Sequence, residues 1–130
     1  MGRGYGLGYR AYHTKMDAFS LEELTGLVIS DLALENDTLG MAFENGSSLS
    51  IFNKCEIDRG DASKLDSMKG EHLVSVTDTP TTIDFTFSNG VTIRVGMTES
   101  DFCGPEAMLY HDADGRIVVW REESIKKPTE

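Results

Sequence analysis

The side chains that could carry out chemistry are few and widely spaced in this sequence. Cys103 lies in an Asp-Phe-Cys-Gly-Pro stretch upstream of His111, and a thiol with an imidazole base could form a nucleophilic pair. A buried, inert thiol is the alternative for Cys103. The sequence has no G-x-S-x-G element, no phosphate-binding glycine loop before a helix and no H-E-x-x-H pattern. The sequence therefore predicts a protein that is not an enzyme and that holds no cofactor.

A cation site is the second possibility, at the run that holds His111, Asp112 and Asp114. Imidazole and carboxylate groups suit several divalent metals. The same D-x-D-G run has the composition of a tight turn, which is the alternative interpretation. Cys55 and Cys103 lie far apart, without a histidine or a second cysteine at zinc-ligand spacing. They are expected to be free, partly buried thiols, because a domain of this size can build a core without disulfides. A disulfide between them is the alternative if the fold brings their Cα atoms within about 7 Å.

Charge is the strongest overall feature of this 130-residue chain, whose net charge is −10 at pH 7. A field of that sign repels nucleic acid and anionic lipid and favours encounter with basic surfaces, although solubility alone is an alternative reason for it. Six acidic residues follow the last expected strands and predict two acidic, partner-binding loops, unless they form an ordinary solvated rim. These residues are Glu56, Asp58, Asp61, Glu99, Asp101 and Glu106.

These residues belong to a duplicated framework. A shift of 44 positions aligns residues 24–53 with residues 68–97 without a gap, and Asn45-Gly46 then meets Asn89-Gly90. Continued past the repeat, the same alignment matches Cys55, Glu56 and Asp58 with Glu99, Ser100 and Phe102. Each copy is expected to contain a short helix that stops at a glycine, a strand, and two runs of alternating apolar residues. The expected helices lie at 20–26 and 61–69, the strands at 27–34 and 73–77, and the alternating runs at 39–51 and 83–95.

Each pair of alternating runs flanks Asn-Gly, which is a hairpin signal. A two-residue loop would place the apolar sets of the two strands on opposite faces. A three-residue loop pairs Phe85 with Ile93, and Met41 with Leu49, so that all apolar side chains share one face. The pattern therefore predicts a type I turn with a G1 bulge at the glycine.

A third hairpin is expected over residues 107–121, with Tyr110 opposite Val118. Three strands per copy and two in this hairpin predict about eight antiparallel strands. The expected fold is mainly β, a pseudo-twofold sandwich or curled sheet with two short helices. A single domain would span 19–121 (repeat 1 about 20–57, repeat 2 about 61–98), between flexible tails at 1–18 and 122–130.

The repeated Phe-x-Asn-Gly hairpins resemble those of small bacterial proteins built from duplicated β-repeats with an F-x-[DN]-G signature. The motif appears here as Phe43–Gly46 and Phe87–Gly90, and the likeness covers about residues 20–121. Such acidic domains are similar to immunity proteins that neutralise the toxins of contact-dependent inhibition systems. The resemblance implies a scaffold, and no functional residue is carried over from it.

A non-catalytic binding protein is therefore expected, whose partner is a basic toxin domain such as a nuclease. A small-molecule or metal-binding module is the alternative function. No apolar run approaches the roughly 18 residues of a membrane span, and no hydrophobic stretch follows the N-terminal residues as in a secretion signal. A cytoplasmic monomer or homodimer, without nucleic-acid or membrane binding, is expected.

Overall fold

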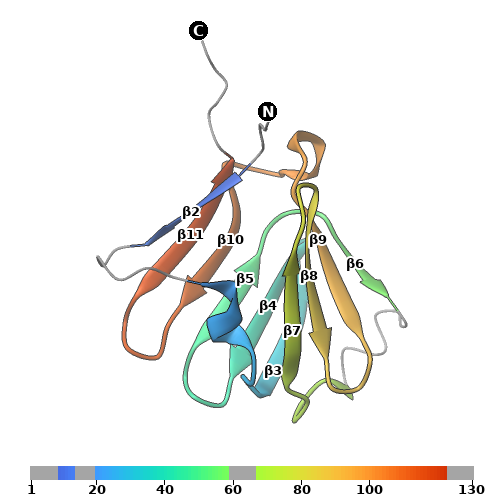
Figure 1. Cartoon of the computed structure of the whole chain (residues 1–130), viewed down its shortest axis with the longest axis vertical. Coiled ribbons are helices and arrows are strands. Elements are labelled where there is room, and N and C mark those ends of the chain that lie inside the picture. The colour runs from blue at the N-terminus through green and yellow to red at the C-terminus, as the bar shows by residue number, and fades with distance from the viewer. Residues whose placement is uncertain (1–8, 14–19, 59–66, 123–130) are drawn as a thin grey trace, which may run out of the picture.

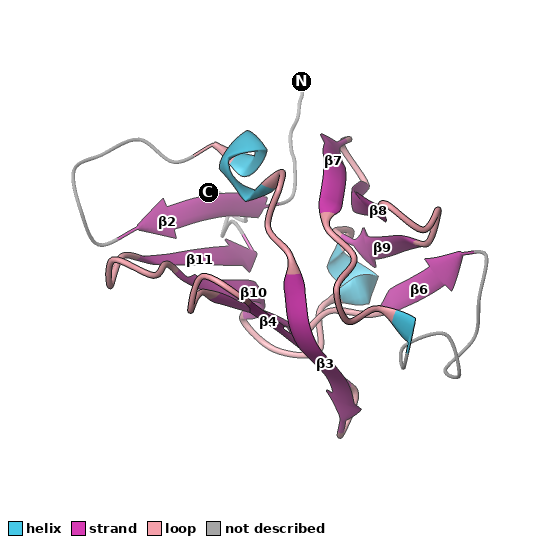
Figure 2. Ribbon diagram, turned by 90° about the horizontal axis from the view of Figure 1, so that it is seen from below, coloured by secondary structure: helices cyan, strands magenta, loops and turns pink. Residues whose placement is uncertain are grey.

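Two antiparallel β-sheets make up most of the protein (Figures 1 and 2). The computed structural model describes residues 9–13, 20–58 and 67–122. The six-stranded sheet has the order β2 (Tyr9–His13), β11 (Ile117–Glu122), β10 (Glu106–His111), β5 (Ser48–Ile51), β4 (Thr38–Phe43) and β3 (Ile29–Glu35). The four-stranded sheet has the order β6 (Cys55–Asp58), β9 (Thr92–Gly96), β8 (Thr82–Phe87) and β7 (Leu73–Asp78).

The predicted repeat is confirmed by the strand registers. In the first copy Met41 lies opposite Leu49, and in the second copy Phe85 lies opposite Ile93. The strand before each hairpin carries a β-bulge at the same place, between Ile29 and Asp31 and 44 positions later in β7. Alternation of apolar and polar residues thus buries one face of every hairpin.

The predicted three-residue hairpin loop is also confirmed. The Gly46 N–H donates to the Phe43 carbonyl at 3.0 Å, and the Phe43 N–H donates to the Ser47 carbonyl at 2.9 Å. Gly46 has a φ of 94° and Gly90 one of 88°, which is the left-handed region that a G1 bulge requires. The third hairpin has its expected register, with Tyr110 opposite Val118.

The two copies are hydrogen-bonded to each other at equivalent positions. Val28 forms an antiparallel bridge with His72, its counterpart 44 residues later. The Gly26 N–H donates to the Leu73 carbonyl at 2.7 Å, and the Gly70 N–H donates to the Ile29 carbonyl at 2.8 Å. Each of these bonds has its counterpart when the copies are exchanged, so the duplicated segments recognise one another through their backbones.

The copies also exchange a fourth strand. Strand β6 follows the first copy but pairs with β9 of the second, whereas β10 follows the second copy but pairs with β5 of the first. Cys55 lies opposite Val95 and Met108 lies opposite Ile51, which makes Cys55 and Met108 equivalent at a separation of 53 positions rather than 44. The second copy therefore has the longer link before its fourth strand.

This exchange corrects the alignment beyond the repeat itself. An ungapped alignment matches Cys55, Glu56 and Asp58 with residues 99–102, but the strand equivalent to β6 is β10. Glu56 and Asp58 lie on a strand instead of a loop. Four residues with two inward side chains gave too weak an alternating pattern to reveal it.

The helical turns are short. The capping box at Ser20 is present, and it opens the 3₁₀ helix η1 (Leu21–Leu24). A further 3₁₀ turn, η3 (Glu99–Asp101), was not expected. The expected helix at 61–69 lies mostly outside the described residues. Among those described, no helix is long and apolar enough to cross a membrane.

The ends of the chain differ in part from the expected tails. Residues 9–13 form β2 and pair with β11, with Tyr12 opposite Val119, so a flexible tail over all of 1–18 is wrong at these residues. Their pairing partner supplies the reason, because an exposed edge of β11 satisfies the backbone groups of a short segment that has little apolar periodicity of its own. The remaining tail residues lie outside the described part, apart from Glu122 at the end of β11.

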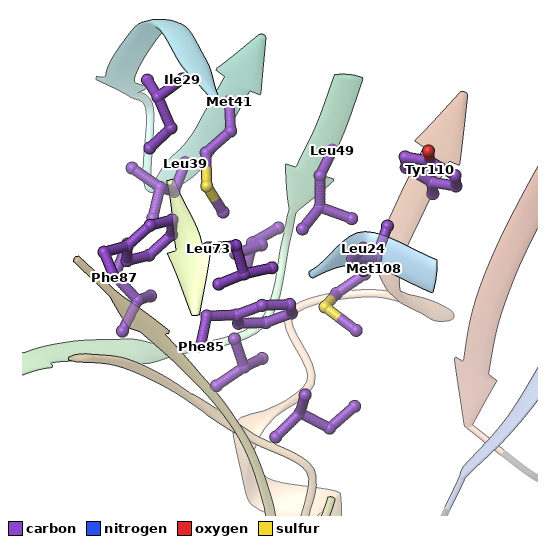
Figure 3. Packing of buried hydrophobic residues seen from close by; sticks show 14 of the residues in the cluster. Leu24, Ile29, Leu39, Met41, Leu49, Leu73, Phe85, Phe87, Met108 and Tyr110 are labelled. Atoms are coloured by element: carbon purple, nitrogen blue, oxygen red, sulfur yellow. The ribbon is translucent and has the colours of Figure 1, made fainter. Parts of the chain in front are cut away.

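The hydrophobic core draws on both sheets and on η1 (Figure 3). Phe85 and Phe87 of the four-stranded sheet, Leu49 and Met108 of the six-stranded sheet, and Leu24 of η1 all belong to one buried cluster. Burying large side chains from both sheets in one cluster couples their stabilities. The two sheets consequently hold the connecting links in fixed relative positions.

Candidate functional site

Two inter-strand links and one turn converge beside the six-stranded sheet, and we call this region the link end. The links are Phe52–Lys54, between β5 and β6, and Met97–Pro105, between β9 and β10; the turn is Asn36–Asp37, between β3 and β4. The Lys54 N–H donates to the Asp101 carbonyl at 3.0 Å, and the Phe52 N–H donates to the Ala107 carbonyl at 2.8 Å. The long link passes beside the β7–β8 turn at the top of Figure 1, where the Met97 N–H bonds to the Thr81 carbonyl at 2.8 Å. The link end is thus tied to both sheets.

A groove of about 380 Å³ lies at the link end. It is lined by Asn36, Asp37, Thr38, Phe52, Cys103, Gly104, Pro105 and Glu106. Its walls offer two carboxylates, an amide, an aromatic ring and a thiol. This volume falls within the roughly 300–1,000 Å³ of small-ligand sites.

The β3–β4 turn sets one wall of the groove. Glu35 lies opposite Thr38, so Asn36 and Asp37 form a two-residue loop, with φ values of 50° and 65°. Both φ values are positive, as a type I′ turn requires, and asparagine and aspartate tolerate this region better than other residues with a Cβ. Sequence reasoning missed this wall, although an Asn-Asp pair between two apolar runs is itself a hairpin signal.

The longer link forms the opposite wall. The Thr98 hydroxyl and N–H both donate to Asp101 Oδ2, at 2.6 and 3.0 Å, which closes η3 as a capping box. Gly96 makes this arrangement possible, because a Cβ at that position would overlap the Asp101 carboxylate. By the 44-residue shift, Gly96 is the counterpart of Phe52, so the two copies differ at the very place where the groove lies.

The six acidic residues predicted to bind a partner are not all brought together. Glu99 is exposed in η3, Asp101 serves as a cap, and Glu106 is half-buried at the start of β10, with Arg121 at 3.8 Å; these three belong to the link end. Glu56 and Asp58 are exposed on β6. Asp61 lies outside the described residues.

On the outer face of the four-stranded sheet, Arg94 partly neutralises the neighbouring acidic groups. Glu56 lies directly opposite Arg94, whose Nε donates to both oxygens of Asp84 at 3.3 Å. Opposite charges across neighbouring strands stabilise a sheet modestly. Glu56, Asp37 and Glu99 all lack an ion pair within the described part of the chain, but Glu56 faces a cation across the strands and is therefore the weaker candidate for partner binding.

The residues considered for a cation site are engaged in the turn of the third hairpin. Asp112 Oδ2 accepts from Arg116 Nε at 3.0 Å and lies 2.8 Å from Arg116 Nη2, which also contacts Glu23 of η1. The other Asp112 oxygen accepts from the Asp114 N–H at 3.3 Å. His111 and Asp114 are exposed. No three His, Cys, Asp or Glu side chains of the described residues form a group suited to a metal.

Cys103 and His111, considered from sequence as a nucleophilic pair, lie toward opposite ends of β10. Cys103 lies three residues before β10, and His111 is the last residue of that strand, which is itself about 17 Å long at 3.3 Å per residue. Both thiols are free; Cys103 is exposed in the groove, and Cys55 is half-buried. Burial raises the pKa of the Cys55 thiol above its ordinary value, so it is the less reactive of the two toward alkylation.

Searches against protein-family models, curated proteins and solved structures found no match to this chain.

Proposed function

We propose that this protein is a non-catalytic binding protein that neutralises a basic partner through its link end. The observation that carries the proposal is the pair of exposed carboxylates there, Asp37 and Glu99, which make no ion pair among the described residues. An unpaired surface carboxylate contributes little to folding but can contact a cation on a partner. Its fixed backbone, in a tight turn or a 3₁₀ turn, lowers the entropic cost of that contact.

The most concrete partner is a bacterial toxin domain with a basic, nucleic-acid-binding surface. A net charge of −10 accelerates encounter with such a surface by electrostatic steering. An immunity protein must capture its toxin quickly and at low concentration, so a high association rate suits that role. A cytoplasmic setting follows from the proposal and agrees with two unpaired thiols in a chain of this size.

A rigid scaffold supports this function. We infer that the domain is a pseudo-twofold sandwich, since the bonds between Gly26 and Leu73 and between Gly70 and Ile29 are equivalent and the core cluster includes both sheets. Crossed fourth strands tie each sheet to both copies. Such a scaffold presents its links without the ordering cost of a flexible binder.

The proposal predicts that a basic toxin domain is encoded beside this gene, and co-expression with that domain tests it. We expect the protein to restore growth to cells that express the toxin and to co-purify with it. Association should slow as salt rises, because steering is screened over a Debye length of about 8 Å at physiological ionic strength. Unrestored growth, or association insensitive to salt, would contradict the proposal.

A further inference from the structure

We propose that the groove at the link end receives an arginine side chain of the basic partner. This inference deepens the proposed function, on which it rests, by assigning a recognition site and the chemistry of its occupant. It follows from the shape of the groove, from the charge of its walls and from the difference between the two copies at this position.

The groove exists because the copies diverged. The link before β10 is longer than the one before β6, and its residues Cys103, Gly104 and Pro105 supply one wall. At the counterpart of Phe52 the second copy has Gly96, and the Asp101 carboxylate occupies the space above it. The second copy therefore fills this position with its own Asp101 side chain, whereas the first copy has Phe52 beside an open groove.

The lining fits a guanidinium better than an ammonium. Arginine stacks its planar group on an aromatic face and forks toward carboxylates, whereas lysine offers a compact, strongly hydrated charge. Phe52 provides the aromatic ring, and Asp37 provides a carboxylate without an ion-pair partner among the described residues. Glu106 adds a second carboxylate to the lining, and it forms an ion pair with Arg121 at 3.8 Å.

Cys103 gives a local readout of occupancy in the full chain. Tetra-arginine peptide should slow alkylation of Cys103 by neutral iodoacetamide, and tetra-citrulline, which has the same shape without the charge, should not. Alkylation of Cys55, followed by mass spectrometry in the same sample, is the internal control. Equal protection by both peptides, protection of both thiols alike, or no protection would overturn the inference.

Two variants test the assigned contacts. Asp37→Asn keeps a residue that tolerates positive φ while removing the charge, and it should weaken tetra-arginine binding about two- to fivefold. Phe52→Leu should weaken it by about threefold and reduce the preference for tetra-arginine over tetra-lysine. Glu44→Gln, an exposed change in the β4–β5 loop, is the matched control and should leave Cys103 protection unchanged. An effect of Glu44→Gln as large as that of Asp37→Asn would also contradict the inference.

The inference and the proposed function can fail separately. If the toxin domain binds but Asp37→Asn and Phe52→Leu leave its affinity unchanged, the groove assignment is wrong and the binding function stands. If tetra-arginine protects Cys103 but no toxin is neutralised, the groove recognises arginine and the proposed partner is wrong.

Discussion

Gly96→Ala should destabilise the protein through one identifiable clash. The new methyl group would overlap the Asp101 carboxylate, and Asp101 would have to leave the position where it accepts from the Thr98 hydroxyl and N–H. Loss of a side-chain cap of this kind costs about 1–2 kcal/mol. Gly96 does not have a positive φ, so no backbone strain adds to this figure.

A double-mutant cycle separates this explanation from a general loss of packing. Asp101→Ala alone should cost about the same 1–2 kcal/mol, because it removes the same two hydrogen bonds. Once Asp101 is alanine, Gly96→Ala should be neutral or slightly stabilising, since a strand glycine has more freedom to lose on folding. The coupling energy is then about 1–2 kcal/mol. Urea unfolding with an unchanged m-value measures it, and additive costs would refute the reasoning.

Other expectations follow from the turns, ion pairs and thiols. Gly46→Val should cost more than about 1–2 kcal/mol, because a β-branched residue resists a φ of 94°, and a melting temperature equal to the parent's would count against the turn assignment. Arg116→Gln should lower the free energy of unfolding in urea by about 1–2 kcal/mol, because the largely enclosed Arg116 guanidinium bridges two carboxylates. Arg94→Gln, on the open sheet face, should lower it by less than about 1 kcal/mol. The reverse order would contradict the assigned contacts. Burial raises the pKa of the Cys55 thiol, so its contribution to the free energy of unfolding is complete below the ordinary thiol pKa and is lost as the pH rises above it. Iodoacetamide at pH 8 should therefore modify Cys55 more slowly than the exposed Cys103.

Much of the fold could be predicted because apolar periodicity determines strand register. The pairing of Phe85 with Ile93 followed from one rule, that a one-residue slip would expose every apolar side chain of the hairpin. The repeat made the prediction firmer, since the same loop had to suit both copies. Ser20 also capped its helical turn as its sequence indicated.

The exchange of fourth strands could not be predicted from local patterns. Strand β6 has four residues, and its partner β9 lies about 40 positions away, so no turn or spacing connects them. Strand β2 forms for a similar reason, by adding to the edge of β11. Long-range pairings of this kind depend on which sheet edges remain open after the hairpins form.

The candidate site was predicted less completely than the fold. Glu99 and Glu106 were expected on one acidic loop, and Glu106 lines the groove, but Asp37 and Phe52 reach it from a turn and a link that are distant in sequence. A groove arises from the meeting of several segments. Residue types alone therefore indicated that the surface is acidic, but they did not indicate where the groove lies.

The most direct measurement is the dissociation constant of the co-purified basic partner for two doubly neutralised variants of equal net charge. Asp37→Asn with Glu99→Gln removes charge at the link end, whereas Glu44→Gln with Asp114→Asn removes it from exposed positions in two hairpin loops elsewhere. We predict that the first pair weakens binding about tenfold and that the second changes it by less than about twofold. Equal weakening by both pairs would show that overall charge, and not the link end, recognises the partner.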